Sequence, residues 1–378
     1  MVTLVRSAHY MEHFRCLGGD CEDTCCQSWT VPVDEANYRR LTVLAADRPI
    51  AAKLLHEGVE LTPEGPSFAR LRFGESGRCG MLDERGLCQI HGELGPSALP
   101  DVCATYPRYC NEVDGVLEQF GTLSCPEVAR QCLASEDAFT LQELEFAEPP
   151  RKLRNQFATE KPYYKPYLRL RSQFSALLAR QDYTLSEKLF ALLWSCGKLA
   201  DIVHVRASQL PIGDFEYALM GLLNDVALAN LANNYRSLTL DGSLALSVMS
   251  SLLGSADSTW EEHVRQRDNM PAHISGCAET CVTRYCQNYL MTTPYMLHEN
   301  LFAYARSLLR SATALRILIQ RRLAGFDGSA AELDARLVEV VYRFSRRLEH
   351  SDLFNQLDKV LEQQGLSSLA HTVGFLAI

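Results

Sequence analysis

Cysteine is the residue type with the most evident chemistry in this sequence, because ten of the fourteen cysteines lie within the first 132 residues. The chain opens with the closely spaced series Cys16-x4-Cys21-x3-Cys25-Cys26, and a second series follows further on. Short spacings let one loop present several thiolates to the same metal centre. The cysteines that we predict as metal ligands are Cys16, Cys21, Cys25, Cys26, Cys79, Cys88, Cys103 and Cys125.

The number of these thiols bears on the kind of metal centre. Eight thiolates exceed the four that a single zinc ion accepts. An iron–sulfur cluster, or two metal centres, accommodates them better, and zinc remains the alternative. His91 lies three residues after Cys88 and is either a further ligand or a group that orients a ligand.

The cysteines outside these series are better interpreted as packing residues than as metal ligands. A lone buried cysteine usually behaves as a small hydrophobic residue, and we interpret Cys132 and Cys196 in this way. Cys277, Cys281 and Cys286 lie in a helical stretch, where packing is the favoured interpretation and metal binding the alternative.

The sequence favours a cytoplasmic location, where thiols are kept reduced and clustered cysteines predict metal binding or redox chemistry rather than disulfides. No run of about 18 apolar residues could span a membrane. The first thirty residues are too charged for a secretory signal peptide. The net charge of −9 argues against a protein that coats nucleic acid.

The elements that must position the cysteines differ along the 378 residues, a length that suggests two domains or one large one. Residues 1–150 carry a net charge of −12 and the remainder carries +3, and Pro149-Pro150 breaks regular structure at the change. We predict a loop-rich, cysteine-rich iron–sulfur (metal-binding) domain over residues 1–148, with short helices and strand fragments. An all-α helical domain follows over residues 151–378, so the predicted fold class is mainly α.

Helical periodicity defines the second domain, where we expect seven to nine helices between about residues 163 and 365. One apolar helix face consists of Leu185, Leu189, Leu192, Leu193 and Cys196. Three capping boxes and two terminal glycines predict where helices start and end: Thr184–Glu187, Ser258–Glu261, Ser329–Glu332, Gly254 and Gly325.

Taken together, the cysteine motifs resemble those of the flagellin lysine-N-methylases, and their N-terminal part resembles the wider CxxCxxCC family of iron- or zinc-chelating domains. The segments that carry the resemblance include the cysteine series above, Cys103…Tyr106-Pro107-Arg108, Ser124-Cys125-Pro-Glu127, Gln287-Asn-Tyr-Leu290 and Asn300-Leu-Phe302. The resemblance implies methyl transfer from S-adenosylmethionine to surface lysines of flagellin before its export. It also implies a [4Fe-4S] cluster on the N-terminal cysteines. The lack of an apolar run and the negative net charge argue against a membrane or nucleic acid as a partner.

A lysine methylase must deprotonate an amine of pKa about 10.4, which costs roughly 4–5 kcal/mol at pH 7. Tyrosines and carboxylates suit that task, and Tyr289, Tyr285 and Glu299 are candidates near the Asn-Tyr-Leu segment. The Gly-x-Gly-x-x-Gly fingerprint is absent, so the sequence does not locate the cofactor pocket. The Cys-x3-Cys-x2-Cys spacing of radical enzymes also fails at Ser28, which favours polar methyl transfer beside a structural cluster.

A basic stretch over residues 151–180 suggests a docking surface that includes Arg169 and Arg171, or else a solvated helix face. Two other functions stay open at this stage. One is a non-catalytic metal-binding adaptor or regulatory protein, which would not bind S-adenosylmethionine. The other is a nucleic-acid enzyme with a structural cluster, which would bind single strands in a salt-sensitive way.

Overall fold

The computed structural model describes residues 3–27, 29–62, 64–65, 67–146, 150–157, 166–205, 212–254, 259–349 and 353–378. The fold is mainly α, as predicted. The chain divides into two compact units: unit 1 is Met1–Glu112, Val116–Gln131 and Thr140–Gln156, and unit 2 is Val113–Gly115, Cys132–Phe139 and Phe157–Ile378. The predicted domain limits at residues 148 and 151 stay a prediction, and residues 147–149 lie outside the described residues.

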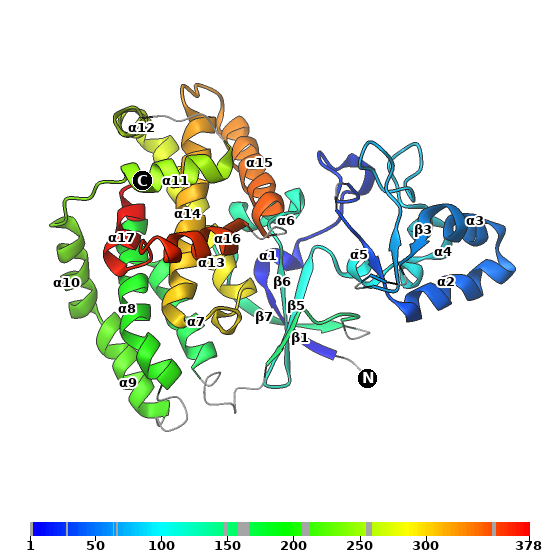
Figure 1. The fold of residues 1–378 in the computed structure, drawn as a ribbon, viewed down its shortest axis with the longest axis horizontal. Coiled ribbons are helices and arrows are strands. Elements are labelled where there is room, and N and C mark those ends of the chain that lie inside the picture. The colour runs from blue at the N-terminus through cyan, green and yellow to red at the C-terminus, as the bar shows by residue number, and fades with distance from the viewer. Residues whose placement is uncertain are drawn as a thin grey trace. The chain divides into compact units, whose positions relative to one another are not determined.

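A five-stranded sheet in the order β7-β1-β6-β5-β8 is the most regular part of unit 1 (Figure 1). Its strands are β1 (Thr3–Ala8), β5 (Arg108–Val113), β6 (Val116–Gly121), β7 (Leu141–Phe146) and β8 (Asn155–Phe157). β1 runs parallel to β6 and antiparallel to β7. Asp114 and Gly115 turn the chain between β5 and β6 with φ of 54° and 74°, the left-handed pair of a tight hairpin. The sheet is more extensive than the strand fragments that the sequence predicts for this region.

The short helix α1 (His9–Glu12) follows β1 without a loop and is fixed to the sheet. Tyr10 and Met11 are buried, and the Tyr10 hydroxyl accepts a hydrogen bond of 2.8 Å from the Gly121 amide. A Cβ at Gly121 would lie 2.5 Å from the Met11 sulfur, so the close approach requires glycine. The helix α6 (Pro126–Ala134) begins a few residues after β6.

The rest of unit 1 contains a three-stranded sheet, in the order β2-β4-β3, and several short helices, which together enclose a hydrophobic core of their own. Its elements are β2 (Pro32–Val33), α2 (Glu35–Asp47), α3 (Pro49–Gly58), β3 (Val59–Leu61), β4 (Ala69–Leu71), α4 (Gln89–Leu94), η2 (Pro96–Ala98) and α5 (Asp101–Thr105), preceded by η1 (Gly18–Asp20). Val33, Leu54, Leu71, Met81 and Ile90 belong to the core, and several of the predicted ligand cysteines pack against it. We call this part the cysteine module.

Unit 2 is helical, as predicted for the second half of the chain (Figure 1, green to red). Its elements are α7 (Tyr167–Ala179), α8 (Leu185–Val205), α9 (Ile212–Leu223), α10 (Asp225–Arg236), α11 (Ser243–Leu253), α12 (Trp260–Asp268), α13 (Ala272–Thr292), η3 (Tyr295–Leu297), α14 (Leu301–Leu323), α15 (Ala330–Glu349), α16 (Leu353–Gln363), α17 (Leu369–Val373) and η4 (Gly374–Ala377). α8 and α14 pack against each other, and both helices bury many apolar side chains. The number of α-helices in the described part of residues 163–365 is slightly larger than the seven to nine that we expected.

The predicted helix signals of unit 2 are largely confirmed. The apolar face of α8 is buried at all five predicted positions. Thr184 with Glu187, and Ser329 with Glu332, form reciprocal capping hydrogen bonds. The box predicted at Ser258 and Glu261 is wrong by one residue, because Thr259 and Glu262 make the reciprocal hydrogen bonds and Ser258 lies outside the described residues. Gly254 and Gly325 end helices with φ of 61° and 67°.

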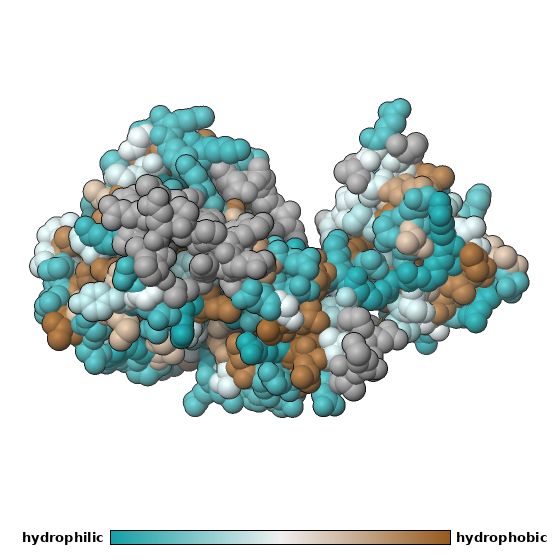
Figure 2. Space-filling model, turned by 90° about the horizontal axis from the view of Figure 1, so that it is seen from below, coloured by the Kyte–Doolittle hydropathy of each residue, from teal (hydrophilic) through white to brown (hydrophobic). Residues whose placement is uncertain are grey.

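The helices in the described part of the chain include none that is long and apolar enough to cross a membrane. Figure 2 shows one face of the molecule, where hydrophobic residues form small groups among hydrophilic ones. Scattered apolar side chains of this kind are normal on a folded protein.

Candidate functional site

Four of the eight predicted metal ligands lie close together in the cysteine module. Cys103 interacts electrostatically with Cys88, Cys79 and Cys25, and Cys88 and Cys79 each interact with Cys25 in the same way. Burial raises the pKa of the Cys79, Cys88 and Cys103 thiols, and the neighbouring thiols raise it further. We call these four residues the cysteine quartet. A metal cation at this place would remove the unfavourable charge interaction by binding the thiolates.

Local backbone structure positions each thiol of the quartet. The Cys79 amide donates a hydrogen bond of 2.9 Å to the Cys26 carbonyl, which joins the first cysteine series to the second. Cys88 is the N-cap residue of α4, and the amides of Ile90 and His91 lie against its sulfur, where they lower the thiol pKa against the larger effect of burial. Cys103 lies within α5.

The His91 ring was predicted as a ligand or as an orienting group. The contact that the structure shows is made by the His91 backbone amide, and the residue is exposed. Amides that point at a ligand sulfur stabilise its thiolate form and tune the metal centre.

The other predicted ligands have different surroundings. Cys125 interacts with Cys21 and Cys25, and burial raises its pKa to about 12 although the amides of Glu127 and Val128 lower it. Cys21 donates a hydrogen bond of 3.3 Å to the Asp23 carbonyl, and Cys16 is exposed. Cys26 is half-buried beside the core of the module.

The spacing of the thiols limits the kind of metal centre that fits. A tetrahedral zinc ion with bonds of about 2.3 Å holds its sulfur ligands about 3.8 Å apart. Within the described ranges, no three cysteine sulfurs lie within 4.8 Å of one another. The arrangement is therefore wider than a closed zinc site requires, whereas a cluster binds one thiolate at each of its irons and spreads its ligands further.

The predicted catalytic residues do not share one environment. Tyr285 is buried, with its ring edge-on to Phe344 at 5.4 Å between centroids. The Tyr289 hydroxyl donates to Ser307 Oγ at 3.2 Å and lies 3.3 Å from His298 Nε2. Glu299 is exposed between η3 and α14. Tyr285 therefore packs in the helical core, and its catalytic role stays a prediction.

Tyr289 belongs to an aromatic group formed by α13, η3 and α14. Tyr304 lies between its neighbours Tyr289, Tyr295 and His298, with ring centroids 5.3–6.5 Å apart. Burial, together with the positive charge of Arg306, lowers the pKa of His298 to about 4. The imidazole is therefore neutral near pH 7 and can accept a proton only at a cost.

A polar pocket of about 450 Å³ lies wholly within unit 2, between the start of α8 and the middle of α13. Its volume falls within the range of small-molecule sites. Acidic and basic side chains both line it, including Glu187, Lys188, Arg236, Glu279 and Arg284. We call it the α8–α13 pocket.

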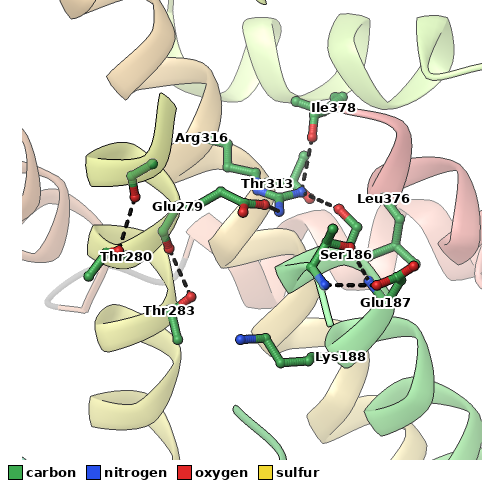
Figure 3. A network of polar contacts seen from close by, with 12 residues as sticks. Ser186, Glu187, Lys188, Glu279, Thr280, Thr283, Thr313, Arg316, Leu376 and Ile378 are labelled. Carbon is green, nitrogen blue, oxygen red and sulfur yellow. Dashed lines mark hydrogen bonds and ion pairs between the residues drawn. The ribbon is translucent and has the colours of Figure 1, made fainter. Parts of the chain in front are cut away.

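Figure 3 shows three of the charged side chains that line this pocket, Glu187, Lys188 and Glu279. Lys188 is buried, its ammonium donates to the Leu178 and Arg180 carbonyls, and burial lowers its pKa although Glu279 raises it. Glu279 keeps half of its side chain exposed and forms a long ion pair of 3.4 Å with Arg316. The pocket therefore offers fixed positive charge beside an accessible carboxylate.

No sequence motif predicted the α8–α13 pocket. Its lining comes from residues as far apart as Glu136 and Gln287, and no short motif joins them. The capping box at Thr184 and Glu187 is recognisable in the sequence, and both residues line one wall of the pocket. Glu187 also accepts a hydrogen bond of 2.6 Å from Arg236.

The predicted basic docking surface is only partly exposed. Arg169 is exposed and pairs with Glu216 at 2.8 Å. Arg171 is buried against the Tyr167 ring, so the prediction that it forms part of a docking surface is wrong. Residues 158–165, which include the predicted docking residues Lys161 and Lys165, lie outside the described residues.

Three curated proteins from Salmonella are similar to this chain. The flagellar biosynthetic protein FliU of Salmonella muenchen is 30% identical over 160 residues, which make up 41% of this chain and 91% of FliU. Two proteins named lysine-N-methylase, from Salmonella choleraesuis and Salmonella typhimurium, are each 24% identical over 249 residues, or 64% of this chain. The match spans only 58% of the length of each methylase. No family model and no solved structure matches the chain.

Proposed function

Because the chain belongs to the flagellin lysine-N-methylase family, we propose that it transfers methyl groups to the side-chain amines of protein lysines. The observation that carries the proposal is the similarity to two lysine-N-methylases over 64% of the chain. The name of FliU supports a flagellar protein as the substrate, and we propose flagellin before its export.

We propose S-adenosylmethionine as the methyl donor. The lysine nitrogen attacks the methyl carbon with its lone pair, and the bond from that carbon to the sulfonium sulfur breaks as the new bond forms. Sulfur keeps the electron pair and becomes a neutral thioether, while the amine proton passes to a base or to water. The protein must desolvate the ammonium, lower its pKa and align the two reacting atoms.

The α8–α13 pocket suits the amino-acid end of this donor, which carries a carboxylate and an ammonium. Lys188 and Arg284 supply positive charge at the pocket, and the half-exposed Glu279 carboxylate can accept hydrogen bonds from the ammonium. The buried Lys188 ammonium is fixed by two carbonyls, so it costs little to orient when the ligand binds.

For the metal centre, we propose that the cysteine quartet of Cys25, Cys79, Cys88 and Cys103 holds a [4Fe-4S] cluster. The electrostatic interactions among these thiols, their wide spacing and the amides at Cys88 support this choice. The cluster would hold together α4, α5 and the loop at residue 25, and so supply folding free energy to a small module.

The proposal is tested by incubating the anaerobically purified full chain with flagellin and methyl-labelled S-adenosylmethionine. We expect label on flagellin lysines. Glu279→Gln should weaken donor binding at least about tenfold, since a hydrogen bond to a charged group contributes about 1.5–3 kcal/mol. Glu261→Gln, an exposed carboxylate on α12, is the matched control and should leave donor binding unchanged. If the intact protein neither binds the donor nor labels flagellin, the methyltransferase proposal fails and the metal-binding adaptor becomes the better account.

A further inference from the structure

Three metal-binding side chains meet in unit 1 apart from the cysteines, at the end of β1. His9, Glu12 and His13 each place one ligand atom within 4.8 Å of the others, and within the described residues this is the one group of three such side chains that does so. His9 Nε2 lies 3.8 Å from Glu12 Oε2, and the rings of His9 and His13 are edge-on with centroids 5.0 Å apart. We call these residues the His9 triad.

The spacing of the three residues in the sequence explains why their side chains lie close together. Residues three and four positions apart share one face of a helical turn, so His9, Glu12 and His13 project to the same side of α1. The spacing His-x-x-Glu-His is also one that zinc enzymes use to bring two imidazoles to one ion.

The backbone of the triad is held in place before any metal binds. Tyr10 and Met11 point into the core from the other side of the turn, and the His9 amide donates a hydrogen bond of 2.9 Å to the Thr140 carbonyl. The ligand side chains themselves are half-buried or exposed, so they can adjust their rotamers.

The carboxylate has an orienting partner on a neighbouring strand. Gln142 on β7 donates a hydrogen bond of 2.6 Å from Nε2 to Glu12 Oε2. Metal-binding carboxylates and imidazoles are typically held by such outer hydrogen bonds, which fix the ligand geometry.

We propose that the His9 triad binds a divalent first-row transition-metal ion. Bonds of about 2.0–2.2 Å place neighbouring ligand atoms about 3.0–3.4 Å apart, so the side chains need to close by only about 1–2 Å. Two imidazoles and one carboxylate favour such an ion over magnesium or calcium, which prefer oxygen ligands. The three ligands come from one side and leave other positions of the ion open to water or to another molecule. This site depends neither on the cysteine quartet nor on the proposed methyl transfer.

Cobalt(II) titration of the full chain tests the proposal, because imidazole and carboxylate ligands give weak visible bands whereas thiolates give intense near-ultraviolet charge-transfer absorption. We expect the wild-type protein to bind one equivalent more than His13→Gln, with a spectrum for that equivalent that lacks thiolate absorption. Gln142→Ala should weaken binding of this equivalent about tenfold or more through loss of the orienting hydrogen bond. His273→Gln, an exposed histidine on α13, is the matched control and should bind as the wild type does.

A titration in which His13→Gln and Glu12→Gln each bind as many equivalents as the wild type, with the same affinity, would overturn the proposal. An extra equivalent whose spectrum shows only thiolate absorption would overturn it too. Both ligand residues are exposed, so neither substitution threatens the fold, and the circular dichroism of each variant checks this directly.

Discussion

The cysteines of the two units show how one residue type acquires two roles. In unit 1, Cys25, Cys88 and Cys103 are half-buried, lie beside other thiols and, at Cys88, receive backbone amides. In unit 2, Cys196 and Cys286 are fully buried among apolar helix faces. Burial alone raises the pKa of Cys196 far above its ordinary value, which keeps the thiol protonated and inert.

Metal chemistry is therefore inferred only where cysteines that cluster in the sequence also cluster in space. Cys281 and Cys286 are as close in sequence as the members of the first series, yet both are enclosed in the helical core. Unit 1 has small cores and is expected to depend on a metal, whereas unit 2 is expected to be stable through packing alone.

The largest effect should come from replacing a thiol of the quartet. Cys88→Ala should release the metal and abolish cooperative unfolding of unit 1, since structural metal sites contribute on the order of 10 kcal/mol. Cys196→Ala should keep the metal and cost about 1 kcal/mol, because only one small buried group is lost. Metal analysis and thermal unfolding of the two variants check this. Equal metal loss in both would remove the distinction between the units.

A smaller but still large effect is expected in unit 2 when a buried ion pair loses one member. Arg310 is completely buried on α14 and pairs with Asp358 on α16. Asp358→Ala leaves an uncompensated buried charge and should lower the free energy of unfolding by about 3–5 kcal/mol. Glu339→Ala, which breaks more exposed pairs with Arg322 and Arg343, should cost about 1 kcal/mol or less. Denaturant unfolding that gives equal costs would contradict this account of the helical core.

Acid should weaken unit 2 through its buried histidines. Burial lowers the pKa of His263 to about 4, with Arg267 and Arg321 acting in the same direction, whereas an unfolded histidine titrates near 6.5. The unfolded chain therefore binds more protons between these values, so stability is present above pH 6.5 and falls as the pH drops toward 4. One such group contributes about 3 kcal/mol over that window.

His263→Phe isolates this contribution. His298, with a pKa lowered to about 4, acts in the same direction, so the variant should lose about half of the pH dependence that the two histidines produce. Denaturant unfolding of both proteins from pH 7 to pH 4 measures it. An unchanged slope in the variant would show that His263 is not kept neutral by the fold.

The smallest effect on stability is expected at the basic stretch. Arg169→Ala removes an exposed pair with Glu216 and should change the free energy of unfolding by no more than about 0.5 kcal/mol. If the exposed part of this stretch docks flagellin, the same variant should raise the Michaelis constant for flagellin and leave donor affinity alone. An unchanged Michaelis constant at low salt would assign Arg169 to a solvated helix face.

Local patterns predicted the helices well and the sheets poorly. The face from Leu185 to Cys196 depends on residues within three turns, so its periodicity is visible in the sequence. The strands of unit 1 are short, and β1 pairs with strands more than a hundred residues away, which no short window can show. The misplaced capping box arose because Ser258-Thr259 and Glu261-Glu262 offer two equivalent registers.

The sites also differ in how far they could be predicted from the sequence. The first cysteine series was visible because its members are adjacent, and the His9 triad could have been found from its spacing of three and four residues. The α8–α13 pocket could not, because helix packing assembles it from distant segments. The surroundings of Tyr285 could not be predicted, because proximity in sequence to the Asn-Tyr-Leu segment does not determine the direction in which a helical side chain points.

Iron and acid-labile sulfide in the anaerobically purified full chain test the division between the units most directly. We expect about four iron atoms and four sulfides per chain, with broad brown absorption, and their loss in Cys88→Ala but not in Cys196→Ala. Stoichiometric zinc without acid-labile sulfide would contradict a cluster in the cysteine module. Iron and sulfide retained in Cys88→Ala would contradict the assignment of the quartet.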